Sequence, residues 1–282
     1  MSLMNLPQIS ALANLPKSLG FDKRPDAVQR WSPDLKAKSD NADTVITIYD
    51  DIGESWYSEG VTAKRIAAAL RSIGDKDVVV NINSPGGDYF EGISIYNLLA
   101  QHKAKVTVQV VGMAASAASI IAMAGDEILM GDGTFLMIHN AWSLAIGNRH
   151  DLKSSIDVLE QIDTAMADLY AQRSGLSNAE IVGMMDRESW IGREAALNNG
   201  FATGELDIST VESSEDGERK KAKALMDAAM GQAGYTRSQR REVFQKISGM
   251  PSATETADKP SAVSDDVVQQ LKEFNNLFSK GH

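Results

Sequence analysis

VTVQVVGMAASAASIIAMAG, residues 106–125, joins an apolar stretch with alternating valines to a run of small residues at helical spacing. The pattern predicts a buried strand that gives way at Gly112 to a helix. Ser116 then lies at the helix N-terminus, where unpaired N–H groups favour a developing anion, so it is a candidate nucleophile. Two alternatives remain from these residues alone: a serine that fills space among alanines, and a membrane span, which the interspersed polar residues and charged ends disfavour.

The composition is that of an ordinary globular chain, with 282 residues, of which 43% are hydrophobic and 23% charged. The absence of cysteine excludes disulfides, a thiol nucleophile and thiolate metal sites, and suits a reducing cytoplasm. A net charge of −10 argues against a nucleic-acid partner, because phosphate contacts need a basic face. No basic leader with an apolar core opens the chain, so we expect a cytoplasmic protein without a membrane partner. No His, Asp and Glu cluster stands at metal-ligand spacing, so we expect neither metal nor cofactor.

The middle of the chain alternates between strand and helix patterns. Strands are predicted over residues 45–49, 77–83, 106–111, 127–130 and 134–138, and helices over 61–74, 91–103, 151–174, 177–185 and 192–198. This alternation predicts an α/β domain with a parallel sheet and helical crossovers.

The two ends of the chain differ in composition from this domain. Residues 1–43 are polar and dotted with proline, and we expect a loosely structured arm in which Trp31 could lie against the domain. Residues 207–282 predict a linker and a helical tail that does not belong to the α/β core. The tail has a basic helical stretch near 237–246, a polar linker over 251–264 and an amphipathic helix over 265–277 whose apolar face predicts a partner. The predicted domain between them covers residues 44–206.

A second motif, INSPGGDYFEG, follows the predicted strand that ends near Asn83. Pro85 and two glycines specify a tight turn, and Gly86 and Gly87 leave backbone N–H groups uncovered by side chains. Such a loop can cradle an anion or oxyanion, although a plain strand-to-helix turn is the favoured interpretation when the motif stands alone. Neither a dinucleotide fingerprint nor a P-loop has this spacing.

Four histidines are available as a general base. His282 is terminal, His102 suits a helix C-terminus, and His150 lies in a polar loop. His139 directly follows an apolar strand, so its backbone is anchored while its imidazole can face a cleft. It is the best candidate to activate Ser116, although a lone histidine at a strand end is more often structural.

These motifs lie on strings that resemble the ClpP serine peptidases. The strings INSPGGDYFEGISIYNLL, GMAASAASIIAMAG and MIHN occur in the family's order and at similar separations, and DRESWIGREAALNNGFATGEL resembles a late family segment. The resemblance covers about residues 45–206. IYDDIGESWYSEGVTA is more similar to the phage and prophage subgroup, which is associated with capsid-protein processing during head assembly.

The resemblance implies a role for each matching residue. Ser116 is the nucleophile and His139 the general base, and Gly87 and Ala117 supply the N–H groups of the oxyanion hole. The family's third triad member is an aspartate, which falls here on Glu188. Glutamate can also orient a histidine, but Asp186 is near enough to compete for the role.

The implied fold is the ClpP/crotonase type, a spiral of ββα units, here with a mostly helical C-terminal extension. The implied function is a serine endopeptidase that acts on polypeptide substrates and assembles as a ring-shaped homo-oligomer through the helix at 151–174. The subgroup implies capsid or scaffold proteins as substrates, in the host cytoplasm or the assembling prohead. A Clp-type ATPase partner is not expected, because the arm does not resemble the family's axial loop.

Two other classes of function remain open. One is a crotonase-type enzyme that binds acyl-CoA and stabilises an enolate with backbone N–H groups, a reaction that needs no serine. The other is a ring-forming scaffold relative with weak or no catalysis, to which the glutamate at position 188 lends support.

Overall fold

The computed structural model describes residues 20–38, 42–55, 57–58, 60–207, 211–213 and 217–248. The chain divides into two compact units, of which the first ends at Arg240 and the second begins at Arg241. The predicted linker at 251–264 and the predicted helix at 265–277 lie outside the described residues.

The first unit is built on a sheet whose centre is the valine-rich strand β5. Its strands are β3 (Val45–Ile48), β4 (Val78–Ser84), β5 (Val106–Ala115), β6 (Glu127–Met130), β7 (Phe135–Ile138), β9 (Ser189–Gly192) and β10 (Gly204–Glu205). The order β10-β6-β5-β4-β3 is parallel throughout. β7 runs parallel to the last residues of β5, and β9 pairs antiparallel with β7. The predicted parallel sheet is therefore confirmed, with one antiparallel strand that was not predicted as a strand.

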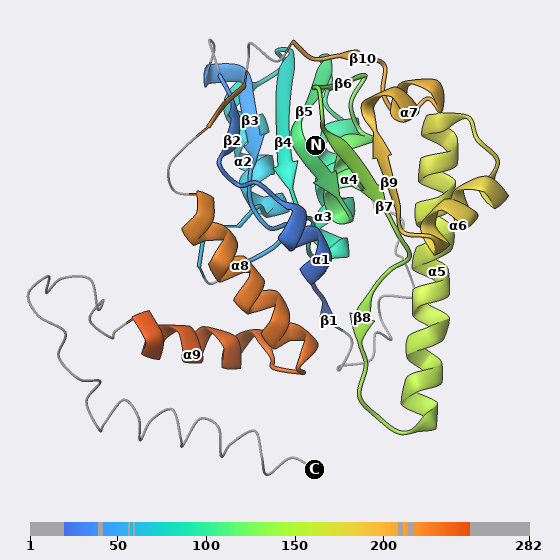
Figure 1. Ribbon diagram of the computed structural model, residues 1–282. Coiled ribbons are helices and arrows are strands. Elements are labelled where there is room, and N and C mark those ends of the chain that lie inside the picture. Colours follow the sequence, from blue (N-terminus) through green and yellow to red (C-terminus); the bar gives the residue numbers. More distant parts are fainter. Residues whose placement is uncertain are drawn as a thin grey trace, which may run out of the picture. The chain divides into compact units, whose positions relative to one another are not determined.

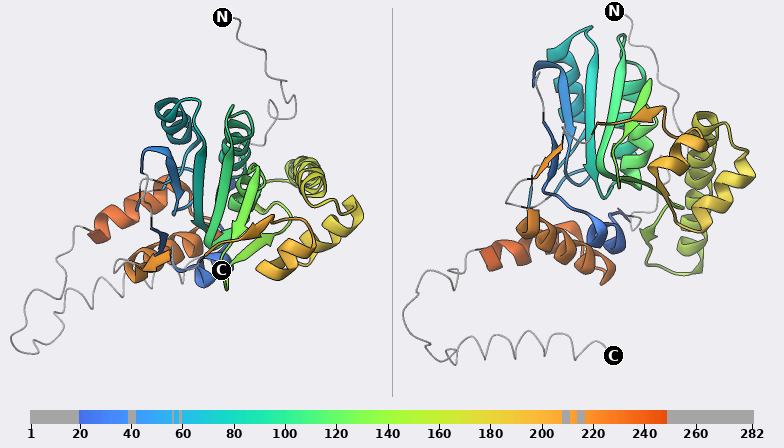
Figure 2. Two further views of the ribbon diagram at one scale, coloured as in Figure 1. Left: turned by 90° about the horizontal axis from the view of Figure 1, so that it is seen from above. Right: turned by 45° about the horizontal axis from the view of Figure 1, so that its top comes forward.

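Helices α2 (Ala63–Ile73), α3 (Tyr89–Ala100) and α4 (Ala117–Ala122) cover one face of this sheet (Figures 1 and 2). Helix α5 (Arg149–Ser174) contacts α4, and α6 (Asn178–Asp186) and α7 (Arg193–Asn198) contact β9. Capping residues set their starts: the side chains of Thr62, Asp88, Asn148 and Ser177 each accept a backbone N–H of the first turn. The helices predicted over these stretches are confirmed.

The opposite face of the sheet is covered by segments from the two ends of the chain. Helices α1 (Pro25–Arg30) and α8 (Gly217–Gln232) pack together on it, and Figure 2 shows both on this side. Strand β5 serves both faces because side chains alternate along a strand. Ala114 packs in the main core, whereas Met113 and Ala115 pack with Ala27, Val28, Ala224 and Ala228.

The expectation of a loosely structured arm is wrong for its described part, residues 20–38. Trp31 is fully buried, and its Nε1–H donates to the Asn83 carbonyl at 3.0 Å. The Asn83 side chain in turn donates from Nδ2 to the Ser32 carbonyl at 2.7 Å and accepts from the Met113 N–H at 3.2 Å. The expected break of the strand at Gly112 is also wrong, since β5 continues to Ala115. Gly112 is instead where the Asn83 side chain fits, because a Cβ there would lie 2.5 Å from Asn83 Oδ1.

The remaining elements are short or lie towards the C-terminus. They are β1 (Gly20–Phe21), which pairs with β8 (Ser143–Leu144), β2 (Leu35–Ala37), which pairs with β11 (Val211–Ser213), a 3-10 helix (Ala42–Thr44) and α9 (Arg237–Ser248). α9 contains the predicted basic helix. Within the described residues, no helix is long and apolar enough to cross a membrane.

Replacing Trp31 with alanine tests whether the arm is part of the fold. We expect Trp31→Ala to lower the free energy of unfolding by about 3–5 kcal/mol, because it removes a buried ring and leaves a cavity. Urea unfolding of the variant and of an exposed-site control, Ile146→Ala, measures this; Ile146 is 68% exposed. An unchanged stability in Trp31→Ala would contradict the packing described above.

Candidate active site

Ser116 occupies a strained corner between strand and helix. Strand β5 ends at Ala115 and α4 begins at Ala117, and Ser116 between them has φ 55° and ψ −126°. The Ser116 N–H donates to the Met137 carbonyl at 2.9 Å, and its carbonyl accepts from the Ser119 hydroxyl at 2.7 Å. Non-glycine residues rarely adopt a positive φ, and such strain gathers at functional sites. Among the described residues, only Ser116 and Glu188 do so outside glycine.

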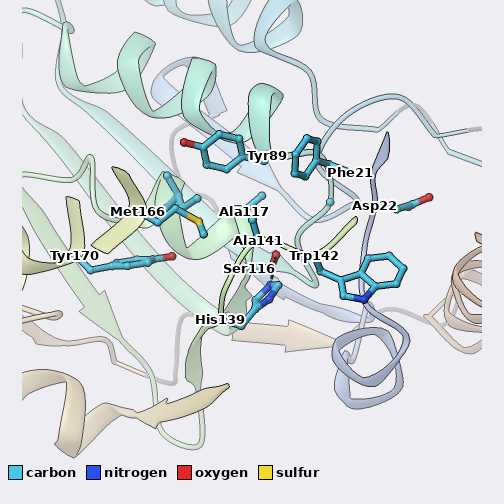
Figure 3. A pocket seen from close by; sticks show the side chains of 12 residues that line it. Phe21, Asp22, Tyr89, Ser116, Ala117, His139, Ala141, Trp142, Met166 and Tyr170 are labelled. Atoms are coloured by element: carbon cyan, nitrogen blue, oxygen red, sulfur yellow. Dashed lines mark hydrogen bonds between the residues drawn. The ribbon is translucent and has the colours of Figure 1, made fainter. Parts of the chain in front are cut away.

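His139 reaches Ser116 because of the strand order. β7 pairs with the last residues of β5, with Ala115 opposite Met137, so Ser116 lies close to the end of β7, where His139 follows. His139 Nε2 and Ser116 Oγ lie 2.7 Å apart, a hydrogen-bond distance that is drawn in Figure 3. His139 is 6% exposed, so the pair is largely shielded from water. The structure thus brings together the two residues that the sequence motifs singled out.

The glycine turn fits against the Ser116 corner. Gly86 has φ +91°, and a Cβ there would lie 2.6 Å from both the Ala115 carbonyl oxygen and the Ser116 Cβ. Gly87 has φ +150°, and a Cβ there would lie 2.2 Å from the Ile52 carbonyl oxygen. Both positions therefore need glycine for conformation and for space. The Ile52 backbone holds the loop, donating to the Gly86 carbonyl and accepting from the Asp88 N–H, both at 2.9 Å.

Two backbone N–H groups border the same small pocket as Ser116 and His139. Gly87 and Ala117 both line this pocket, and neither N–H donates to any acceptor within the described part of the chain. Ala117 is the first residue of α4, so its N–H has no partner inside the helix. Unpaired N–H groups beside a nucleophile are the geometry that stabilises an oxyanion.

Neither candidate for the third triad position contacts His139 through a hydrogen bond. Glu188, with φ 52°, accepts a hydrogen bond from Arg24 Nη1. Asp186 accepts from Asn140 Nδ2 at 2.8 Å. Nδ1 of His139 is buried and makes no hydrogen bond with any described residue. Within the described residues, therefore, no carboxylate holds His139 in the tautomer in which Nε2 accepts the serine proton.

The surroundings of His139 favour its neutral form. Burial lowers the pKa of His139 to about 4, and the positive charge of Arg24 acts in the same direction. The charge of Glu188 and the backbone of Asn140 oppose this shift and do not cancel it. A neutral imidazole is the form that can accept a proton from serine.

The pocket at Ser116 is small and is lined in part by residues of the N-terminal arm. Its free volume is only about 20 Å³, and Phe21 and Asp22 line it together with Trp142 (Figure 3). The Phe21 ring packs edge-on against Phe90, with centroids 5.3 Å apart. The sequence analysis did not predict that Phe21 and Asp22 line the site. The signal that could have indicated it is the aromatic Phe21 within a polar segment. Across the described chain, no group of three or more His, Asp or Glu side chains is arranged to hold a metal ion.

Comparison with known proteins identifies the family. A model of the Clp protease family matches residues 40–205, which is more than half of the chain. The chain belongs to the Clp protease family. Helix α1 lies before the start of this match and α8 lies after its end, so the helices that cover the second sheet face come from outside the family domain.

Two curated relatives and one solved structure show the degree of similarity. An ATP-dependent Clp protease proteolytic subunit of Deinococcus radiodurans is 28% identical over 135 residues, covering 47% of this chain and 66% of the relative. A protein of the same name from Bacteroides fragilis is 29% identical over 131 residues, covering 45% of this chain and 62% of the relative. Both alignments thus span slightly less than two thirds of the relative's length. A ClpP1 mutant structure from Listeria monocytogenes matches with a TM-score of 0.51 at 22% identity, covering 62% of this chain and 94% of that one. This likeness confirms the expected ClpP-type fold.

A methyl group at Gly87 tests the role of the glycine turn in the Clp protease site. We expect Gly87→Ala to lower the rate of fluorophosphonate labelling of Ser116 by at least about tenfold, because the loop must move and carry the Gly87 N–H away from the pocket, where it is expected to stabilise an oxyanion. The control is Gly74→Ala, which has a similarly strained φ of +73° but meets no atom within 4 Å. Equal labelling rates in the two variants would contradict the assignment.

The ionisation of His139 can be followed directly by NMR. We expect its ring proton signals, assigned by comparison with His139→Gln, to titrate with a midpoint near pH 4 because of burial and Arg24. The pKa of His139 in the folded protein lies below the usual value of about 6.5. This histidine therefore lowers the free energy of unfolding as the pH falls from 6.5 through 4. A midpoint above pH 6 would contradict the description of the site.

Proposed function

We propose that the protein is a serine endopeptidase with Ser116 as nucleophile and His139 as general base. The observation that carries the proposal is the 2.7 Å contact between Ser116 Oγ and His139 Nε2 at a strained corner, beside two unengaged backbone N–H groups. Membership of the Clp protease family and the names of the relatives, proteolytic subunits, support the same reaction class.

In the proposed reaction, Ser116 Oγ attacks the carbonyl carbon of a peptide bond while His139 Nε2 takes the hydroxyl proton. The N–H groups of Gly87 and Ala117 bind the oxygen that becomes negative. His139 then gives the proton to the leaving amine, and the C–N bond breaks to leave an acyl-enzyme. A water molecule, deprotonated by His139, hydrolyses the ester and restores Ser116.

The third member of the triad is proposed to be Glu188. Its charge already acts on His139, and it shares with Ser116 the positive φ that sets both residues apart. A hydrogen bond from His139 Nδ1 to this carboxylate would give the buried ring nitrogen a partner and hold the required tautomer. Asp186 is the weaker candidate, because its charge, unlike that of Glu188, is not among the main influences on the pKa of His139.

Assembly into a ring and processing of capsid or scaffold proteins are further parts of the proposal. The first turns of α5 expose Leu152 and Ile156, 41% and 54% accessible, on a helix that begins outside the main core. Exposed apolar side chains on a long helix suit contact with another copy of the chain. The similarity of residues 48–63 to phage and prophage relatives supports head-assembly proteins as substrates. The protein would then act in the host cytoplasm or in the prohead.

Labelling with a fluorophosphonate tests the proposed nucleophile. Intact mass and peptide mapping should show one adduct at Ser116 that is absent in Ser116→Ala and retained in Ser94→Ala, a change at an exposed helix position. We expect His139→Gln to lower the labelling rate by about 10²–10⁴-fold, the usual contribution of a general base.

The rival functions give different results in this experiment. A crotonase-type enzyme would bind coenzyme A and would not need Ser116 for turnover. A scaffold relative would fold and assemble but would remain unlabelled, and that result would overturn the proposal.

A further inference from the structure

The edge beside the catalytic pair is occupied by the chain's own N-terminal arm. Strand β1 pairs antiparallel with β8, placing Gly20 opposite Leu144 and Phe21 opposite Ser143. β8 belongs to the segment that follows His139, and Ala141 and Trp142 of that segment line the pocket at Ser116. An extended segment on a strand edge next to a nucleophile is also how a peptide substrate binds by strand addition.

Phe21 fills the pocket that such a peptide would need. Its side chain is 6% exposed and packs against the rings of Tyr89 and Phe90. Figure 3 shows Phe21 above the Ser116 corner, near Tyr89. The remaining volume of about 20 Å³ leaves no room for another side chain of this size.

The arm is held in place by charged residues of the C-terminal segment. Lys23 is 3% exposed and pairs with Asp51 and, at 2.7 Å, with Asp227 of α8. Arg240 pairs with Asp22 and, at 3.0 Å, with Asp227. Two of these pairs, Lys23–Asp227 and Asp22–Arg240, connect positions more than 200 residues apart in the sequence.

The arm is bound in a way that does not present Phe21 for cleavage. The Phe21 carbonyl accepts a hydrogen bond from Arg237 Nη2 at 2.8 Å, so it is engaged with a guanidinium instead of the N–H groups of Gly87 and Ala117. Arg24 also binds Glu188, while Nδ1 of His139 stays without a hydrogen-bond partner among the described residues. The arm therefore fills the cleft and withholds the carboxylate that would orient the base.

We propose that residues 20–24 are a built-in peptide inhibitor of the Ser116 site, and that Asp227, Arg237 and Arg240 hold this segment in the cleft. When residues 20–24 leave the cleft, the β8 edge becomes free for a substrate peptide. Glu188 is then released from Arg24 and can pair with His139. The inference rests on the proposed peptidase function and adds its regulation. It also gives a joint role to the segments on both sides of the family domain.

A disulfide across the β1–β8 pair provides a reversible lock. The chain has no cysteine, so Gly20→Cys/Leu144→Cys introduces a single pair at facing Cα positions of an antiparallel ladder. We expect fluorophosphonate labelling of Ser116 to be at least about tenfold slower in the oxidised form than after reduction, because only the open fraction reacts. Each single-cysteine variant, treated in the same way, is the control.

Loosening the arm should have the opposite effect. Arg24→Gln and Arg237→Ala remove partly exposed contacts of the arm, and partly exposed ion pairs contribute little to the stability of the fold. We expect labelling to be several-fold faster in both, whereas Arg219→Ala, which removes an exposed arginine of α8, leaves the rate unchanged.

A binding measurement separates this inference from the proposed function. In a Ser116→Ala background, fluorescence anisotropy of a fluorescein-labelled peptide of residues 17–26 should show binding to the reduced lock and none to the oxidised one. Equal binding, or equal labelling, in the two forms would overturn the inhibitor role. A different result would be peptide binding to the reduced form alone, with no labelling of Ser116 in any variant. That result would support the arm as an occupant of the cleft and would overturn the peptidase assignment.

Discussion

The site depends on one close approach, that of the Gly86–Gly87 turn to the corner at Ser116. Gly86 leaves no space for a side chain, because a Cβ would lie 2.6 Å from the Ser116 Cβ. The turn therefore packs its backbone directly against the nucleophile's corner and brings the Gly87 N–H to the pocket. The positive φ of Ser116 belongs to the same constraint, since the chain must turn there from a central strand into a buried helix. Strand pairing then sets His139 beside Ser116.

The arrangement of Ser116 and His139 suits nucleophilic chemistry, but the cleft beside them is closed to a substrate. Ser116 and His139 are in contact, and the proposed oxyanion donors, the N–H groups of Gly87 and Ala117, have no acceptor among the described residues. Phe21 nevertheless lines the cleft, and the proposed third residue, Glu188, binds Arg24. The low pKa of His139 fits this state, because burial and Arg24 disfavour a charged ring while no carboxylate accepts from Nδ1. An active imidazole needs stabilisation when it takes up a proton, which Glu188 would provide once released.

Much of the fold and the central pair could be predicted from the sequence because they rest on local patterns. Alternating valines and helical spacing mark the strands and helices of the domain, and the motif order predicts that Ser116, His139 and Gly87 belong to one site. The arm could not be predicted in this way. Its buried residues include Lys23, whose partner Asp227 is 204 positions away, and such pairing leaves no periodic trace. The extension of β5 beyond Gly112 was also hidden, because a glycine that makes room for Asn83 looks like a strand terminator.

The most direct test of a complete but closed site is a crystal structure of the protein after Ser116 has reacted with a peptide aldehyde. The account predicts a covalent adduct whose peptide pairs with Ser143 and Leu144 in place of residues 20–21, with Glu188 accepting a hydrogen bond from His139 Nδ1. An adduct at Ser116 with the β1–β8 pair and the Arg24–Glu188 contact both intact would contradict it.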